Sequence, residues 1–339
     1  MTPLVTPVVT LLSVGLSSAC IPGLFPFPAP APPSTSTSSS SSSGSSSSST
    51  VDKVDRRLGN ATDCGHKGRS RVVGGSEAGQ HEFPWHCALL NSEGKFYGCS
   101  ATLISCDPVI AVTAAHCVPA INLPLITIKL RTPAFLACGR NNIDDSKPNK
   151  LEENEQRLRV DKVVAYPSFN KDTFENDIAV IKVQGKFNCV KTVLYPACLP
   201  DKQRMTYVGW SATTVTGWGR VGEGEAAAET LRKAKIPVVT DAECKKVMKK
   251  QKEAPAIRDT MMCGGSTSGG VDSCQGDSGG PLVTTASRAG RKLRRASEGW
   301  SLVGVVSWGL GCARPDTYGV YTELAPYLPW VARQFGLSY

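Results

Sequence analysis

Histidine is scarce in this chain of 339 residues: only four are present, and none of them follows Ser278. They are His66, His81, His86 and His116. Ser278 stands within Gly276 to Gly280, a G-x-S-x-G sequence typical of an exposed, nucleophilic serine. Because the 61 residues after Ser278 contain no histidine, the sequence excludes every hydrolase whose catalytic base follows the serine along the chain.

Long hydrophobic runs are also missing. The apolar segment near the N-terminus, Val8 to Leu16, is too short to span a bilayer comfortably. Small residues follow it at 17–19, so residues 1–19 are predicted to be a secretory signal peptide, although the usual basic residues before the apolar run are absent. The alternative is a wrongly assigned start codon and a disordered tail. We expect a secreted, extracellular protein without a membrane span.

The next segment has little that could form a core. Residues 21–33 are rich in proline, and residues 34–50 are almost entirely serine and threonine. Such a sequence cannot bury apolar surface, so residues 20–71 are predicted to be disordered, either as a flexible linker or as an O-glycosylated stalk. Asn60 begins the only N-glycosylation sequon of the chain and is the predicted glycosylation site.

Cysteine is abundant by contrast. Thirteen cysteines indicate an oxidising compartment, which agrees with secretion. The formal net charge of +9 is moderate.

From Val72 onward, short apolar runs are broken by glycine, proline and asparagine, which predicts an all-β fold. Only Pro326 to Phe335 has helical spacing, with Tyr327, Val331 and Phe335 on one face. The predicted strands include Leu89 to Ile104, Val109 to Thr113, Val160 to Ala165, Ile178 to Val183 and Leu302 to Val306.

Three residues could cooperate in nucleophilic catalysis. A serine is a poor nucleophile unless a base takes its proton, and the base needs an anion to hold its tautomer. His116, in the sequence Ala-Ala-His-Cys, and Asp177, in Asn-Asp-Ile-Ala, precede Ser278 in that order. The order His, Asp, Ser is the one found in chymotrypsin-like enzymes.

These motifs and several others together resemble the chymotrypsin-like (S1) serine proteases, in their trypsin-like, secreted-zymogen branch. The resemblance implies two six-stranded antiparallel β-barrels with a C-terminal helix, in a protease domain over residues 72–339. The motifs, in chain order, are Arg71 to Gly75, Phe83 to Trp85, Ala114 to Cys117, Asn176 to Ala179, Gly217 to Gly219, Gly276 to Pro281, Ser307 to Gly309 and Gly319 to Thr322.

The resemblance also implies the roles of individual residues. Ser278 would be the nucleophile, His116 the general base and then acid, and Asp177 the orienting anion. Backbone N–H groups of Gly276 and Ser278 would form the oxyanion hole, where a side chain on residue 276 would crowd the oxyanion. Asp272 would lie at the base of the primary specificity pocket and attract arginine or lysine, and Ser273 beside it suggests that both are accepted. Other predicted substrate-binding residues are Ser307, Trp308, Gly309 and Gly319.

Activation by proteolysis follows from the same resemblance. Cleavage after Arg71 by another trypsin-like protease would free the α-amino group of Val72, which would pair with the carboxylate of Asp277. Residues 20–71 would then be a propeptide and the uncleaved chain a zymogen.

Four disulfides are implied by position in the family: Cys64–Cys198, Cys99–Cys117, Cys244–Cys263 and Cys274–Cys312. The first would tether the propeptide to the domain after cleavage. Cys20 would leave with the signal peptide, and the remaining four cysteines allow three connectivities. Strand neighbours in the family's first barrel favour Cys87–Cys138 and Cys106–Cys189.

Departures from the family affect its ion sites. Arg140 replaces an acidic calcium ligand found in many relatives and could pair with Glu155, so structural calcium is not expected. Tyr318 stands where sodium-responsive relatives have tyrosine, which suggests a Na⁺ site near the specificity pocket. No other cofactor is expected.

Two insertions could contact binding partners of the protein. Residues 119–133 would form a wall of the cleft near His116, and residues 287–298 carry five basic residues. The second insertion is interpreted either as a solvated loop or as a site for heparin-like polyanions, and nucleic acid is not expected. The expected function is limited proteolysis of protein substrates after arginine or lysine, as in coagulation or immune cascades, with serpin-type inhibitors. The alternatives are a digestive trypsin and a polyanion-binding protease homologue without activity.

Overall fold

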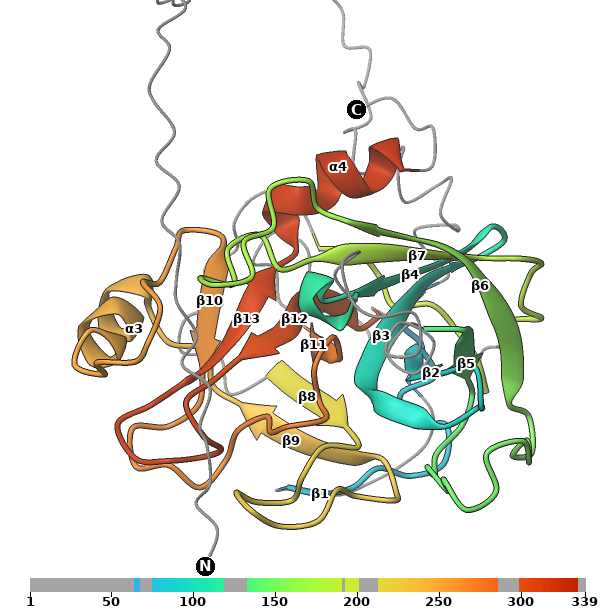
Figure 1. The fold of residues 1–339 in the computed structure, drawn as a ribbon, viewed down its shortest axis with the longest axis horizontal. Coiled ribbons are helices and arrows are strands. Elements are labelled where there is room, and N and C mark those ends of the chain that lie inside the picture. Colours follow the sequence, from blue (N-terminus) through green and yellow to red (C-terminus); the bar gives the residue numbers. More distant parts are fainter. Residues whose placement is uncertain are drawn as a thin grey trace, which may run out of the picture. The chain divides into compact units, whose positions relative to one another are not determined.

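Figure 1 shows the computed structural model of the chain, which describes residues 64–67, 75–118, 133–190, 193–200, 213–285 and 299–334. The chain divides into two units, and all described residues belong to the second, which begins at Ser47. No helix in the described ranges is long and apolar enough to cross a bilayer.

The N-terminal half of the described domain is a closed, antiparallel barrel of six strands, in the order β2-β3-β4-β7-β6-β5. Every position of β2 and β4 is buried, and β-branched residues such as Val109, Ile110 and Val112 suit that environment. The strands are β2 (His86–Leu90), β3 (Phe96–Cys106), β4 (Val109–Thr113), β5 (Phe135–Cys138), β6 (Gln156–Ala165) and β7 (Ala179–Val183).

One strand prediction was wrong in this barrel. Residues 89–104 were expected to form a strand, but the chain turns between β2 and β3. The side-chain oxygen of Asn91 accepts hydrogen bonds from the N–H groups of Glu93 (2.9 Å) and Lys95 (3.0 Å). Gly94 has a φ of 81°, which glycine adopts readily, so the local sequence favours a turn over a continuous strand.

The second half is a sheet of seven strands, in the order β1-β9-β8-β11-β12-β13-β10 (Figure 1). Six of these strands run from β9 at one end to β10 at the other, and a bridge between Val238, just after β9, and Gly264 of β10 joins these two ends. The seventh strand, β1, pairs with the other side of β9. The observed architecture is therefore the expected one, with β1 as an additional short strand. The strands are β1 (Ser76–Glu77), β8 (Thr213–Gly217), β9 (Arg232–Ile236), β10 (Met261–Gly264), β11 (Pro281–Thr284), β12 (Ser301–Trp308) and β13 (Gly319–Glu323).

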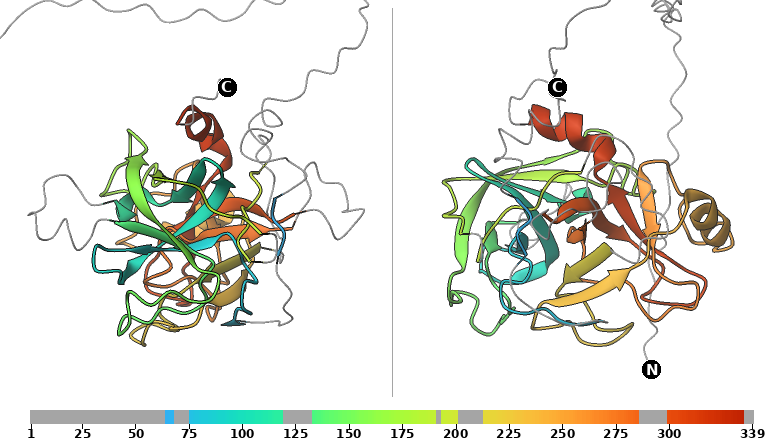
Figure 2. Two further views of the ribbon diagram at one scale, coloured as in Figure 1. Left: turned by 90° about the vertical axis from the view of Figure 1, so that its right-hand side faces the viewer. Right: turned by 180° about the vertical axis from the view of Figure 1, so that it is seen from behind.

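The C-terminal helix packs back on the first barrel. It consists of the short 3₁₀ turn η3 (Ala325–Tyr327) and α4 (Leu328–Arg333), as expected from the spacing of Tyr327 and Val331. Phe335 lies outside the described residues. The rings of Tyr327 and Trp330 contact Tyr166, which follows β6, at centroid distances of 5.0 and 5.2 Å. The two views in Figure 2 show α4 beside the strands of the first barrel.

A second helix corrects the expectation that only the C-terminal end is helical. This helix, α3 (Asp241–Met248), begins at Thr240, whose hydroxyl accepts a hydrogen bond from the N–H of Glu243 at 3.0 Å. Its buried side chains are Cys244, Val247 and Met248. Thr240 and Glu243 have the spacing of a capping box, a signal that was present in the sequence.

All six expected disulfides are present. Cys87 and Cys138 face each other across β2 and β5, and the backbone N–H of Phe187, near Cys189, donates to the carbonyl of Cys106. The two pairings that were inferred only from neighbouring strands are therefore confirmed. The bonds are Cys64–Cys198, Cys87–Cys138, Cys99–Cys117, Cys106–Cys189, Cys244–Cys263 and Cys274–Cys312.

Candidate active site

His116 lies just after β4, in the 3₁₀ turn η1 (Ala115–Cys117). The disulfide between Cys117 and Cys99 fastens this turn to β3. The ring of Phe174 approaches the imidazole in an edge-to-face arrangement, with 5.8 Å between the ring centroids. These contacts restrict the position of the imidazole at the end of the barrel.

Asp177, just before β7, is fully buried and binds His116 twice. Its Oδ1 accepts from the backbone N–H of His116 at 2.8 Å, and its Oδ2 lies 2.7 Å from Nδ1 of the imidazole. Because an ionised carboxylate only accepts hydrogen bonds, Nδ1 must carry the proton. The neutral imidazole then has its lone pair on Nε2, where it can accept a proton.

Further groups hold Asp177 in place. The Ser307 hydroxyl donates to Oδ2 at 2.5 Å, and the Thr322 hydroxyl donates to the backbone carbonyl at 2.7 Å. Both residues come from the second sheet, so the carboxylate joins the two halves of the domain. The side chain of Ser307 thus supports Asp177, a role that the sequence motif did not indicate, and its contact with substrate stays a prediction.

Ser278 reaches the same place from the second half of the domain. Its carbonyl accepts a hydrogen bond from the N–H of Ser100, the residue after Cys99, at 2.8 Å. A Cβ atom on Gly279 would lie 2.2 Å from the Thr113 hydroxyl and 3.2 Å from the nitrogen of Ala114. Glycine at 279 therefore allows the serine loop to approach the segment that leads into His116.

Asp277 is held by the loops around it. Its two carboxylate oxygens accept hydrogen bonds from the N–H groups of Gly219 and Cys274, each at 2.8 Å. Burial of the carboxylate raises the pKa of Asp277 to about 6, although these hydrogen bonds oppose the shift. A Cβ atom on Gly217 or Gly219 would lie 1.9 or 2.6 Å from the Asp277 side chain, which explains why the Gly-Trp-Gly motif has no side chains there.

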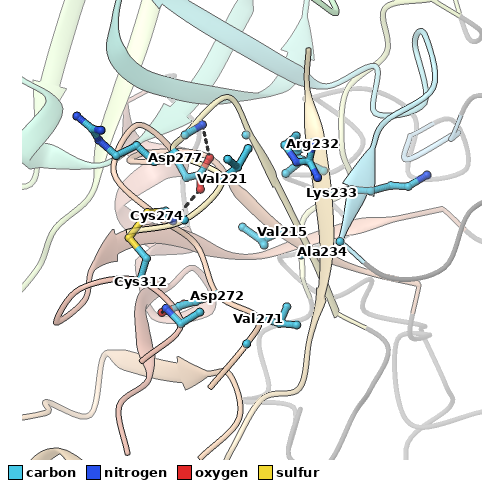
Figure 3. Close-up of a pocket in the computed structure, with 18 residues that line it drawn as sticks. Val215, Val221, Arg232, Lys233, Ala234, Val271, Asp272, Cys274, Asp277 and Cys312 are labelled. Carbon is cyan, nitrogen blue, oxygen red and sulfur yellow. Dashed lines mark hydrogen bonds between the residues drawn. A yellow bond between two sulfur atoms is a disulfide. The ribbon is translucent and has the colours of Figure 1, made fainter. Parts of the chain in front are cut away.

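A cavity of about 300 Å³ lies beside Asp277 and Asp272 (Figure 3). Gly75, the first described residue after the gap that contains Arg71 and Val72, also lines this cavity. Three residues of chain span up to about 10 Å, so the cavity is within reach of residue 72.

Gly276 has a φ of 101°, and a Cβ atom there would lie 2.9 Å from Cα of Gly219. The expected reason for glycine was crowding of an oxyanion. The structure supplies a separate reason, because both the backbone conformation and the contact with Gly219 require the absence of a side chain.

Asp272 is a second carboxylate held by backbone N–H groups. Its Oδ1 accepts from the N–H of Ser273 at 2.8 Å, and its Oδ2 accepts from the N–H of Ala313 at 3.3 Å. Burial raises the pKa of Asp272 to about 6, against the effect of these two hydrogen bonds. The Ser273 hydroxyl lies 3.2 Å from that of Tyr321. A nearby cation would return the carboxylate to its ionised form.

Gly319 lies beside Asp272, and Gly309 lies beside Gly319. A Cβ atom on Gly319 would lie 2.2 Å from Oδ1 of Asp272, and one on Gly309 would lie 3.9 Å from Cα of Gly319. The structure thus brings Gly319 to the carboxylate and Gly309 next to Gly319. The ring of Trp308 lies 6.3 Å from that of Phe174, which sequence reasoning did not single out.

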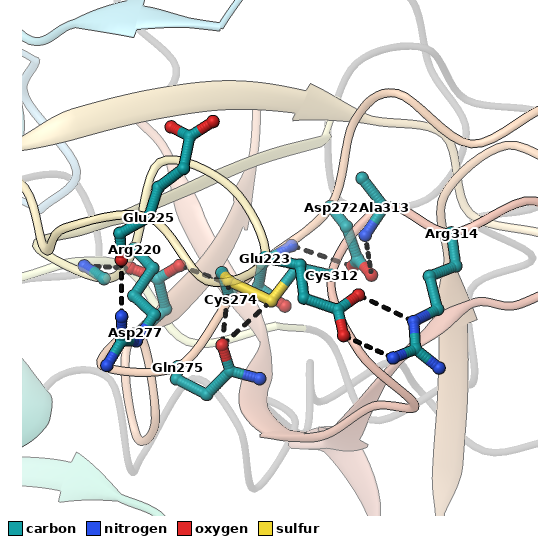
Figure 4. The surroundings of a disulfide bond; sticks show 12 residues. Arg220, Glu223, Glu225, Asp272, Cys274, Gln275, Asp277, Cys312, Ala313 and Arg314 are labelled. Atoms are coloured by element: carbon teal, nitrogen blue, oxygen red, sulfur yellow. Dashed lines mark hydrogen bonds and ion pairs between the residues drawn. A yellow bond between two sulfur atoms is a disulfide. The ribbon is translucent and has the colours of Figure 1, made fainter.

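The disulfide Cys274–Cys312 joins the loop that carries both carboxylates, at 272 and 277, to the loop that carries Ala313 and Arg314 (Figure 4). Near it, Arg314 forms two hydrogen bonds to the carboxylate of Glu223, one of them with 2.6 Å between Nε and Oε2. Hydrogen bonding to Arg314 lowers the pKa of Glu223. Both side chains are exposed, so the pair adds little stability in itself.

The loop where many relatives bind calcium contains its own cations. Nη1 of Arg140 lies 3.8 Å from Oε1 of Glu155, as expected, and Nη2 of Arg157 lies closer, at 2.9 Å. Glu152 accepts hydrogen bonds from the backbone N–H groups of Asn141 and Asn142. The two carboxylates are thus engaged by groups of the protein itself.

Several predicted features lie wholly or largely outside the described residues: the signal peptide, the segment 20–71 with Asn60 apart from residues 64–67, the activation residues Arg71 and Val72, the insertion 119–133 apart from residue 133, and the basic loop at 287–298. Tyr318, the residue linked to sodium, is described and buried.

Comparisons with known proteins agree with this geometry. The trypsin family model matches residues 72–331. Trypsin-1 of Astacus astacus is 35% identical over 265 residues, which cover 77% of this chain and 98% of that protein. Ovochymase-2 of Mus musculus is 34% identical over 275 residues, and the suppressor of tumorigenicity 14 protein homolog of Bos taurus is 36% identical over 277 residues. The matched parts make up 78% and 81% of this chain but only 41% and 30% of those two proteins.

Proposed function

Because the chain belongs to the trypsin family of chymotrypsin-like serine proteases, we propose that it is a secreted zymogen that cleaves proteins after arginine or lysine once it has been activated. The observation that carries this proposal is the buried Asp177 carboxylate bound to Nδ1 of His116, with the Ser278 backbone fastened beside the same turn. The six disulfides support secretion.

The proposed reaction proceeds through an acyl-enzyme. The Ser278 hydroxyl attacks the carbonyl carbon of the substrate, and its proton passes to Nε2 of His116. His116 then gives this proton to the leaving amine as the C–N bond breaks. Water attacks the acyl carbon and gives a proton to His116, the C–O bond to Ser278 breaks, and His116 returns the proton to the Ser278 oxygen as the acid product leaves. Asp177 stabilises the imidazolium, and the N–H groups of Gly276 and Ser278 bind the oxyanion.

Specificity for arginine and lysine is assigned to Asp272. The desolvated carboxylate would gain a counter-charge from the substrate side chain, and the absence of a side chain at Gly319 leaves the Asp272 carboxylate unobstructed.

Activation is assigned to cleavage after Arg71. The new α-amino group of Val72 would enter the cavity beside Asp277 and pair with its carboxylate, which accepts hydrogen bonds from the backbone N–H groups of Gly219 and Cys274. Removal of one partner from a buried pair of this kind typically costs about 3–5 kcal/mol, because the other charge is left buried without compensation.

A cleavage assay tests the whole proposal. Full-length protein cut at Arg71 should hydrolyse a random peptide library after arginine and lysine, and Ser278→Ala should lower turnover by about four to six orders of magnitude. Ser100→Ala is a matched control, because its backbone contact with Ser278 does not use the side chain. Wild-type activity in the Ser278→Ala protein, or cleavage without preference for basic residues, would refute the proposal.

A further inference from the structure

A short segment upstream of the protease domain, residues 64–67, lies against the domain along its backbone. Besides the disulfide to Cys198, the N–H of Gly65 donates to the carbonyl of Pro196 at 2.8 Å, and the N–H of Trp300 donates to the carbonyl of Gly65 at 2.9 Å. Gly65 has a φ of 67°, and a Cβ atom there would lie 2.3 Å from the nitrogen of Trp300. The fit at this position therefore requires glycine.

The same segment ends in a lysine that meets a buried acid. Nζ of Lys67 lies 2.6 Å from Oε1 of Glu82, whose side chain has no exposed surface. Glu82 also accepts hydrogen bonds from Nζ of Lys233, at 2.8 and 2.6 Å, and from the N–H of Gly79 at 2.8 Å. Burial acts to raise the pKa of Glu82, but the hydrogen bonds from Lys233 and Lys67 outweigh it, so the pKa is lowered and the carboxylate is ionised.

Two aromatic rings complete the surroundings of the lysine. Nζ of Lys67 lies 5.1 Å from the ring centroid of Phe83 and 5.2 Å from that of Trp300. These two rings pack edge to face, with 6.0 Å between their centroids. A carboxylate and two aromatic faces around one ammonium group are the chemistry of a cation-binding site.

We propose that Glu82, Phe83 and Trp300 form a receiving site for the Lys67 ammonium, and that this site keeps residues 64–67 bound to the domain without help from the Cys64–Cys198 disulfide. The segment is then attached at two independent points. It stays bound to this surface under conditions that reduce its disulfide.

The site also touches the start of the domain. Lys233, which shares Glu82 with Lys67, lies on β9 opposite Ser76 of β1. Lys67 and β9, the strand that pairs with β1, therefore share one carboxylate. The proposal concerns the uncleaved chain and does not depend on the proposed proteolysis, so the two can fail separately.

Substitution of Lys67 tests the proposed site with little disturbance of the domain. Removal of Lys67 leaves Glu82 paired with Lys233 and Gly79, so the domain keeps a compensated carboxylate. Removal of Glu82 would instead leave the buried Lys233 ammonium unpaired, which would destabilise the domain and obscure the result.

The experiment uses the full-length chain with Cys64→Ser and Cys198→Ser, and it measures hydrogen exchange at single amides. The Trp300 amide donates to Gly65 and reports on the segment, whereas the Leu302 amide donates to Cys198 and reports on the domain. Adding Lys67→Met should speed exchange at Trp300 by on the order of tenfold or more and leave Leu302 unchanged. Lys67→Arg should keep the protection.

Lys245→Met serves as the matched control, because this exposed lysine pairs only with Asp259 among the contacts described for it. If Leu302 also loses protection, the same Lys67→Met change is measured in the chain with its disulfide intact, where Trp300 alone should exchange faster. Equal exchange at Trp300 with and without Lys67, or an unprotected Trp300 in the double-serine chain that retains Lys67, would overturn the proposal.

Discussion

The protonation of Asp272 should control the binding of arginine-like ligands in a way that can be measured apart from catalysis. The pKa of Asp272 without ligand is about 6, because burial disfavours its charge. A cationic ligand such as benzamidine binds the ionised form, so its apparent Kd should rise as the pH falls through 6. Relative to pH 8, simple proton competition gives a Kd about twofold higher at pH 6 and about tenfold higher at pH 5.

The assay is calorimetric titration of benzamidine into activated Ser278→Ala protein between pH 5 and pH 8. The Ser278→Ala substitution is included because it removes turnover. Asp272→Asn provides the control, since its residual binding should be weak and nearly independent of pH over this range. A wild-type Kd that does not change between pH 8 and pH 5 would refute the reasoning. The same pH profile in the Asp272→Asn variant would show that another group is responsible.

Three further predictions concern stability and ions. Burial lowers the pKa of His86 to about 3, so the folded state resists protonation that the unfolded chain accepts below about 6.5, and His86 by itself contributes a loss of about 2 kcal/mol of stability from pH 8 to pH 5. The raised pKa values of Asp272 and Asp277 act in the opposite direction, so the test is the difference between variants: in urea unfolding His86→Gln should be about 2 kcal/mol better off at pH 5, relative to pH 8, than the wild type, and the same pH dependence in both proteins would contradict the assignment. Glu155→Gln leaves Arg140 and Arg157 without their shared carboxylate and should lower the free energy of unfolding by about 3 kcal/mol. EDTA should not change the Tm of the wild type. A wild-type Tm that falls with EDTA would indicate a calcium site. If sodium binds near Tyr318, kcat/KM on an arginine substrate should be higher in NaCl than in choline chloride, and Tyr318→Pro should abolish the difference; equal rates for the wild type would end the idea.

Much of the fold and the candidate site could be predicted from the sequence because their residues occur in short motifs. His116, Asp177 and Ser278 each stand in a distinctive local pattern, and the structure brings the first two into direct contact. The cysteine pairs were accessible for a related reason, since the expected strand neighbours placed Cys87 opposite Cys138.

What the sequence did not predict depends on contacts between distant residues or on local signals that were passed over. Glu82 and Lys233 are 151 positions apart, and nothing near either residue indicates the other. The hydrogen bond from Ser307 to Asp177 spans 130 positions and comes from a motif whose expected role was substrate binding. The helix after Thr240, in contrast, was marked by its capping residues and could have been found.

The most direct test of the account is to locate the site of reaction with a fluorophosphonate probe by peptide mass spectrometry. In protein cleaved after Arg71, we predict covalent label on Ser278, and we predict that His116→Ala slows labelling by several orders of magnitude because the hydroxyl loses its base. Label on a different serine, or equally fast labelling of Ser278 in the His116→Ala protein, would contradict the claim that His116 and Asp177 activate Ser278.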